Sequence, residues 1–214
     1  MSVRVLLADD HAIMREGLRV LLSRATGIDV VAEAGNGHEA VQQALALRPD
    51  VVVLDIAMPG LNGIEAAAMI RSKCATIRLI MLSMHATSEH VYRAFAAGAS
   101  GYLLKEAAAH EVVTAIRAVV GGRQYLSTGL GMAPADLQDT MARSLSPIER
   151  LSARERQVLQ LVVEGHSSSA IAGIVHLSPK SVDTYRSRIM KKLAVEDLAS
   201  LVRFAVQHGL TPNR

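Results

Sequence analysis

Short aliphatic runs alternate with helix-like segments along the first 120 residues of this 214-residue chain. The runs rich in Val, Leu, Ile and Ala cover residues 3–8, 30–34, 51–54, 79–82 and 101–104. Runs of this kind are typical of parallel strands that are buried on both faces. The pattern predicts a doubly wound α/β domain with five parallel strands over residues 1–120. An all-helical domain is disfavoured because the runs are short and bounded by Gly, Pro and Asp.

Between these runs, apolar residues recur at a spacing near that of an amphipathic helix. In the first helical segment, the residues expected to face the sheet are Ile13, Leu18, Leu21 and Leu22. The alternation stops at residue 121. Residues 121–150 are rich in Gly, Pro, Ser and Thr and lack periodicity, so they are predicted to be a linker. A short helix near residues 136–143 is an open alternative for part of it.

From residue 151 to residue 214 the pattern predicts an all-α domain. Ser152 and Glu155 have the spacing of a capping box, which begins one helix, and Gly165 ends it. Ser178 and Pro179 suit the N-cap and first position of another helix. A last helix is expected from about residue 196 to residue 208.

Composition and charge narrow the function. Half of the residues are hydrophobic, and the single cysteine, Cys74, excludes an internal disulfide, as is typical of a reducing compartment. No apolar stretch reaches the roughly 18–20 residues that cross a membrane, so we expect a cytoplasmic protein without a membrane partner. Residues 1–125 contain 12 Lys+Arg and 12 Asp+Glu, whereas residues 126–214 contain 11 and 8. The excess of basic residues indicates that the second domain binds a polyanion.

Polar residues stand where the predicted strands end. They are Asp9, Asp10, Asp55, Ser83 and Lys105. Each has an ordinary explanation, such as a helix cap or a solvated lysine, but the carboxyl ends of parallel strands meet at one edge of a sheet. Carboxylates that lie close together need a cation, and hard oxygen ligands suit Mg²⁺. A carboxylate can also attack a phosphoryl group, whose charge Mg²⁺ and a lysine would neutralise.

The strings LLADDH, VVVLDIAMPGLNG, LIMLSMH and AGASGYLLK resemble the receiver domain of response regulators. The resemblance implies that Asp55 is the phospho-acceptor. It implies that Asp10 binds Mg²⁺ directly, that Asp9 assists, and that the backbone carbonyl of Ala57 completes the ligands from the protein.

The same resemblance assigns a role to three further residues. Ser83 takes the place of the switch Thr or Ser, and Lys105 pairs with the phosphoryl group. Tyr102 matches the switch aromatic that packs inward when Ser83 engages the phosphoryl group. The alternative for Tyr102 is an ordinary rim position on the last strand.

The segment from residue 179 to residue 193 is predicted to be an amphipathic helix with a basic face. At about 100° per residue, the apolar face carries Val182, Tyr185, Ile189 and Leu193. The opposite face carries Lys180, Thr184, Ser187 and Lys191. A solvated surface helix is the ordinary explanation. However, a short helix over residues 168–175 and a turn precede it, which is the helix-turn-helix arrangement that places its second helix in the major groove.

The strings LSARERQVLQLVVEG, AIAGIVHLSPKSVDTYRSRIMKKL and DLASLVRFAVQHGL resemble the LuxR-type helix-turn-helix domain. With the receiver, the resemblance covers nearly the whole chain and implies a NarL/FixJ-type response regulator. The implied DNA-contacting residues are Lys180, Thr184, Ser187 and Arg188, for bases or phosphates, and Lys191 and Lys192, for phosphates.

One stretch and one single residue depart from the pattern of many such regulators. Residues 167–171 read Ser-Ser-Ser-Ala-Ile where many relatives have Ser-Asn-Lys-Glu-Ile, and Asp183 stands where many have Lys. A carboxylate in a groove lined by phosphates is unfavourable unless it is paired. We therefore expect Asp183 to read a cytosine N4 amine or to orient Arg186 or Ser187, and a solvated position is the remaining alternative.

We predict a DNA-binding transcription regulator that is phosphorylated on Asp55 by a sensor histidine kinase and then binds double-stranded DNA as a homodimer. RNA polymerase is a candidate further partner. Catalysis would be limited to its own aspartyl phosphorylation and dephosphorylation. An Mg²⁺-dependent phosphatase or phosphotransferase with an Asp nucleophile is the alternative, but Ala57 stands where such an enzyme would have its acid/base carboxylate. A receiver acting only as an interaction module would leave the basic helices without a role.

Overall fold

The computed structural model describes residues 2–131, 148 and 151–207. The chain divides into two compact units, a first unit over residues 1–144 and a second unit over residues 145–214. Each unit has a hydrophobic core of its own. In the part of the chain that the structure describes, no helix is both long and apolar enough to cross a membrane.

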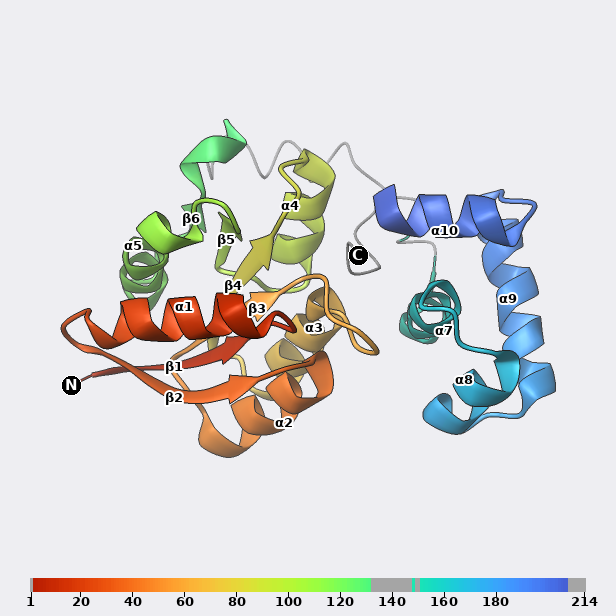
Figure 1. Cartoon of the computed structure of the whole chain (residues 1–214), viewed down its shortest axis with the longest axis horizontal. Helices are drawn as coiled ribbons and strands as arrows, with labels where there is room; N and C mark the ends of the chain where they lie inside the picture. The colour runs from red at the N-terminus through yellow and green to blue at the C-terminus, as the bar shows by residue number, and fades with distance from the viewer. Residues whose placement is uncertain (1, 132–147, 149–150, 208–214) are drawn as a thin grey trace. The chain divides into compact units, whose positions relative to one another are not determined.

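The first unit is built on a parallel sheet with the strand order β2-β1-β3-β4-β5-β6 (Figure 1). The strands are β1 (Val3–Ala8), β2 (Ile28–Ala34), β3 (Val51–Asp55), β4 (Arg78–Ser83), β5 (Gly101–Leu104) and β6 (Tyr125–Leu126). The first five confirm the predicted runs to within two residues. The sixth strand was not predicted, because two residues are too short to show a periodic pattern.

Five helices cover the two faces of this sheet. They are α1 (Ala12–Ser23), α2 (Gly37–Leu47), α3 (Gly63–Lys73), α4 (Ser88–Ala96) and α5 (Ala108–Val120). Alternate residues of β1 point to opposite faces: Leu6 packs with the helices α2, α3 and α4, whereas Val5 and Leu7 pack with α1 and α5. The sheet is thus buried on both sides, which accounts for the continuous aliphatic runs.

One predicted core residue is exposed. Leu18 and Leu22 of α1 are buried against the sheet and Leu21 is half-buried, but the Ile13 side chain is 91% exposed. Ile13 precedes Leu18 by five residues, which rotates it by about 140° around the helix. The prediction that Ile13 faces the sheet is therefore wrong.

The second unit consists of helices around an aliphatic core. They are α7 (Ala153–Val163), α8 (Ser168–Val175), α9 (Pro179–Leu193) and α10 (Leu198–Gln207). The predicted capping box is present, with both hydrogen bonds between Ser152 and Glu155. Ser178 caps α9 by accepting a hydrogen bond from the Ser181 amide. The core includes Val158, Ile171 and Ile189.

The predicted linker begins with ordered structure. Tyr125 pairs with Gly101 and Leu126 with Tyr102, so β6 extends the sheet beside β5. The short 3-10 helix η1 (Thr128–Leu130) follows. The alternative of a short helix near residues 136–143 lies outside the described residues, as does His208 at the expected end of the last helix. The domain bounds of 120 and 151 stay a prediction.

Candidate functional site

Three of the predicted site residues meet at the carboxyl end of the sheet. Asp9 follows β1, Asp55 ends β3 and Lys105 follows β5. Asp9 and Asp55 are 1% and 0% exposed. The ammonium nitrogen of Lys105 lies 2.9 Å from Oδ2 of Asp9 and 2.9 Å from Oδ2 of Asp55. One cation therefore bridges two buried carboxylates, which brings together residues from three strands that are far apart in the sequence.

Burial and the neighbouring charges shift the pKa values of Asp55 and Lys105 in this acidic pocket. Burial, together with the neighbouring Asp9 carboxylate, raises the pKa of Asp55 to about 6, although Lys105 opposes the shift. Burial lowers the pKa of Lys105, but its contacts with Asp55 and Asp9 outweigh that effect and raise the pKa overall. Two carboxylates with a single cation leave excess negative charge when both ionise. A divalent cation would neutralise it.

The donor set at the pocket fits a hard divalent ion. Asp9, Asp10, His11 and Asp55 each offer one ligand atom, and these atoms all lie within 4.8 Å of one another. The Asp10 side chain is 21% exposed, so it can reach an ion that keeps bound water. The backbone amide of Ala57 donates to Oδ1 of Asp55 at 3.2 Å, which places Ala57 beside the acceptor.

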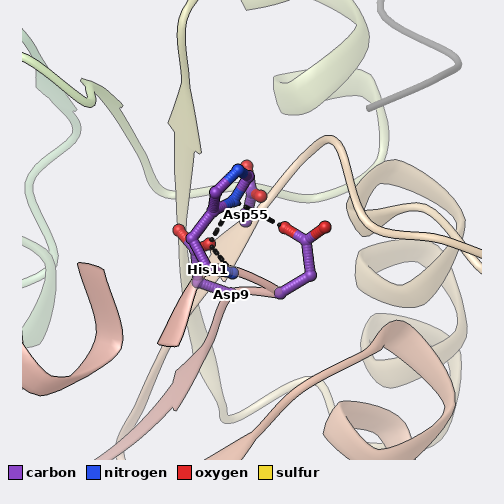
Figure 2. A group of neighbouring side chains, drawn as sticks. Asp9, His11 and Asp55 are labelled. Carbon is purple, nitrogen blue, oxygen red and sulfur yellow. Dashed lines mark hydrogen bonds and ion pairs between the residues drawn. The ribbon is translucent and has the colours of Figure 1, made fainter. Parts of the chain in front are cut away.

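His11 is a member of this cluster that the sequence analysis missed. Its Nδ1 lies 3.2 Å from Oδ1 of Asp9 (Figure 2). The same nitrogen lies 2.8 Å from Oδ1 of Asp10. His11 is the N-cap residue of α1 and makes no side-chain capping bond. Neither acid is the N-cap residue of α1, but Asp9 accepts a hydrogen bond from the His11 amide at 2.8 Å, at the start of this helix. In the sequence, His11 directly follows Asp9 and Asp10 in the string DDH. This adjacency was the feature that pointed to His11 as a member of the cluster.

The loop after Asp55 is held tightly against the strand. Asn62 is buried and caps α3 by accepting a hydrogen bond from the Glu65 amide. The next residue, Gly63, lies so close to the Asp55 carbonyl oxygen that a Cβ there would be 2.0 Å from it. This position requires glycine, and it fixes the path of the loop that carries Ala57.

Ser83 and Tyr102 are both linked to the loop after β4. Ser83 is buried, and its Oγ accepts a hydrogen bond from the His85 amide at 3.0 Å. Tyr102 is 0% exposed, and its hydroxyl donates to the His85 carbonyl at 2.7 Å. Burial raises the pKa of Tyr102. The alternative of an ordinary rim position is wrong for Tyr102, which already packs inward in this structure.

The predicted DNA-facing side of α9 is exposed to solvent. Val182, Ile189 and Leu193 are buried and Tyr185 is half-buried, which confirms the predicted apolar face. The exposed residues of the opposite side are Lys180, Thr184, Ser187, Arg188 and Lys191. The structure thus brings these five candidate contact residues onto one accessible surface of the helix.

Two further candidate contact residues have partners inside the second unit. The Lys192 ammonium lies 2.7 Å from Oε2 of Glu155 on α7. Asp183 accepts a hydrogen bond from Ser168, the first residue of α8. Neither partner follows from the pattern within α9, because each lies on another helix.

Comparison with protein families identifies both units. Residues 5–117 match the model described as the response regulator receiver domain. Residues 149–205 match that of the bacterial regulatory proteins of the luxR family. The chain belongs to the NarL/FixJ-type response regulators. It is a two-component response regulator with a LuxR-type DNA-binding domain, and we therefore set aside the small-molecule phosphatase.

This chain is similar to other response regulators over most of its length. The response regulator UvrY of Escherichia coli (strain K12) is 38% identical over 208 residues, which are 97% of this chain and 95% of UvrY. The response regulator GacA of Pseudomonas viridiflava is 35% identical over 208 residues, 97% of each chain. The crystal structure of a LuxR-family regulator from Aurantimonas sp. SI85-9A1 covers 71% of this chain and 100% of its own, with 39% identity and a TM-score of 0.57.

Proposed function

We propose that Asp55 accepts a phosphoryl group from a sensor histidine kinase and that this reaction controls DNA binding by the second unit. The observation that carries the proposal is the bridge from Lys105 to Asp55 and Asp9 inside a buried pocket. A lysine so placed can neutralise the oxygens of a phosphoryl group on Asp55. The receiver family of residues 5–117 supports the same assignment.

The proposed transfer is a substitution at phosphorus. A carboxylate oxygen of Asp55 attacks the phosphorus of a phosphohistidine, and a new O–P bond forms while the P–N bond breaks. The electron pair of that bond stays on the imidazole nitrogen, which then takes up a proton. Hydrolysis of the acyl phosphate returns the Asp55 carboxylate and inorganic phosphate. These two steps are the only catalysis that we propose for this regulator.

We also propose that the pocket holds Mg²⁺ during this reaction. The carboxylates of Asp9, Asp10 and Asp55 and the backbone carbonyl of Ala57 would be its ligands. Bound there, the ion supplies neutralisation of the charge on the transferring phosphoryl group. The excess negative charge of the pocket and the donor cluster support this assignment.

Phosphorylation of Asp55 would change the conformation of the loop after β4. When the Ser83 hydroxyl turns toward a phosphoryl oxygen, the His85 amide loses its acceptor, while Tyr102 still holds the His85 carbonyl. A bias of roughly a few kcal/mol is enough to shift an existing equilibrium. Two chains would then pair as a homodimer and present two α9 helices to a two-fold site in double-stranded DNA, with RNA polymerase as a candidate partner.

The test replaces the acceptor. Asp55→Asn should abolish labelling by acetyl phosphate with Mg²⁺, and with it the increase in DNA affinity that the phosphodonor produces in the wild-type chain. Asp29→Asn, a change at an exposed carboxylate of β2, is the matched control and should be labelled normally. Undiminished labelling of Asp55→Asn would show that another residue is the acceptor.

A further inference from the structure

Two residues that the sequence analysis singled out in the helix-turn-helix contact each other. Ser168, within residues 167–171, donates a hydrogen bond from Oγ to Oδ1 of Asp183 at 2.7 Å. The same hydroxyl oxygen accepts a hydrogen bond from Nη1 of Arg186 at 3.2 Å. A single hydroxyl group therefore bridges a carboxylate and a guanidinium group.

The bridge connects the start of α8 to the second turn of α9. Asp183 and Arg186 are three residues apart, so they lie on the same side of α9. Ser168 is held in place by the ordered first turn of α8, where Ser167 caps the helix by accepting a hydrogen bond from the Ala170 amide. The guanidinium group of Arg186 is thus attached to a rigid neighbour, which reduces the conformational entropy that it loses on binding a ligand.

The surroundings of Asp183 remove the need for a base contact. Its carboxylate accepts from Ser168, and the positive charge of Arg186 lies on the other side of that hydroxyl. An unpaired carboxylate beside DNA would repel phosphates, but this one is already engaged within the protein. Of the two functions expected from the sequence, orienting Arg186 is therefore favoured over reading a cytosine.

Arg186 retains donors for a ligand. Among the residues that the structure describes, its Nε and Nη2 groups have no hydrogen-bond partner, and its side chain is half-buried. Arg186 lies about 120° around α9 from Lys180, on the side of α8. In a helix-turn-helix the first helix crosses the DNA backbone, so a cation on this side faces the groove wall and not a base edge. A planar guanidinium with free N–H groups matches a phosphate there.

We propose that Arg186 contacts a DNA backbone phosphate and that Ser168 and Asp183 are positioning residues that hold it in place. The inference rests on the proposed function, because it concerns the DNA contact of the same regulator. It adds one phosphate contact that the pattern of α9 did not indicate, and it assigns Asp183 a role through Arg186.

The experiment uses the full chain, treated with acetyl phosphate and Mg²⁺, and a random-sequence duplex library from which bound sites are selected. Arg186→Ala should weaken binding about tenfold, to selected and scrambled duplexes alike. The salt slope is the slope of the logarithm of the binding constant against the logarithm of the salt concentration. In Arg186→Ala its magnitude should fall by about 0.9, the value for one phosphate. Ser168→Ala should shift both quantities in the same direction, whereas Ser168→Thr, which keeps the hydroxyl, should restore them. Ser169→Ala, at the exposed neighbouring position, is the matched control.

A double-mutant comparison of Ser168→Ala and Arg186→Ala distinguishes a positioning role of Ser168 from a merely structural one. If Ser168 acts through Arg186, Ser168→Ala should have no further effect on affinity or salt slope in the Arg186→Ala background. Asp183→Asn, which keeps an acceptor for Ser168, should leave the preferred sequence unchanged. An unchanged salt slope in Arg186→Ala overturns the proposal, as does a relaxed preference at one base position in Asp183→Asn. A wild-type chain that binds no duplex would instead count against the proposed function.

Discussion

The ammonium nitrogen of Lys192 lies 2.7 Å from Oε2 of Glu155, which ties the end of α9 to the start of α7. The Glu155 side chain is 5% exposed and also accepts a hydrogen bond from the Ser152 amide in the capping box. The adjacent Lys191 is exposed and has no side-chain partner among the described residues. Two neighbouring lysines, both expected from the sequence to bind phosphates, thus have different surroundings.

This difference predicts distinct effects of alanine at the two positions. Lys191→Ala should weaken binding to all duplexes about equally and reduce the salt slope by about one unit, since a free lysine can hold a phosphate. Lys192→Ala should lower the free energy of unfolding of the second unit by roughly 1 kcal/mol, because Glu155 loses its cation. Salt-dependent binding and denaturant unfolding of the full chain measure the two effects. A full phosphate effect on the salt slope in Lys192→Ala, with unchanged stability, would contradict this assignment.

The raised pKa of Asp55 predicts how stability depends on pH. Its pKa is about 6 in the folded chain against an ordinary value of 3.8, so the folded state binds the proton more tightly. The contribution of Asp55 to stability is therefore highest below pH 4 and falls as the pH rises from about 4 to about 6. Without Mg²⁺, Asp55→Asn should become increasingly more stable than the wild type over this range and keep a constant advantage above it.

Denaturant unfolding of both chains at a series of pH values measures that difference directly. Taking the difference cancels the titration of groups that the substitution leaves alone. Adding Mg²⁺ at pH 7 should reduce or reverse the advantage of Asp55→Asn, because the ion stabilises the charged pocket of the wild type. A difference that does not change between pH 4 and pH 7 would show that Asp55 has an ordinary pKa.

Asp10 provides a separate test of the metal site. Asp10→Ala should weaken Mg²⁺ binding at least about tenfold and weaken phosphorylation in parallel, since a carboxylate ligand is removed. Titration calorimetry with MgCl₂ gives the affinity, and the mobility of the phosphorylated chain in a phosphate-affinity gel gives the modification. Glu16→Ala, on the exposed surface of α1, should change neither. Equal Mg²⁺ affinity in Asp10→Ala and wild type would leave Asp10 with no role beyond its contact with His11.

The beginning of the predicted linker depends on Glu111 of α5. Its carboxylate accepts hydrogen bonds from the hydroxyl of the buried Ser127 and from the amide and hydroxyl of Thr128. Glu111→Ala leaves the hydroxyl of the buried Ser127 without its acceptor, whereas the donors of the exposed Thr128 turn to water. The loss of the buried hydrogen bond should destabilise the first unit by about 1–3 kcal/mol. Hydrogen exchange at Thr128 should become faster, whereas Glu106→Ala, a change at an exposed acid, should leave it unchanged. Unaltered protection of Thr128 would show that β6 alone holds this segment.

Much of the fold followed from local patterns because each pattern reflects burial. Val51 to Leu54 form a continuous aliphatic run since both faces of β3 are covered, and such a run is readable without any knowledge of neighbours. The capping box of Ser152 and Glu155 is equally local, because its hydrogen bonds span three residues. The pattern was misleading for Ile13, because an apolar side chain alone does not show which side of the helix it lies on.

By itself, the sequence determined the order of the elements, the strand ends at which Asp9, Asp55 and Lys105 stand, and the apolar and basic sides of α9. These features depend on short-range periodicity and on the rule that parallel strands end at one edge. Only the tertiary structure decided the partners: His11 in the acidic cluster, Glu155 for Lys192, and Ser168 for Asp183. The last two pairings join residues 37 and 15 positions apart. The angle and distance at which helices pack determine such contacts, and no periodicity within one segment contains that information.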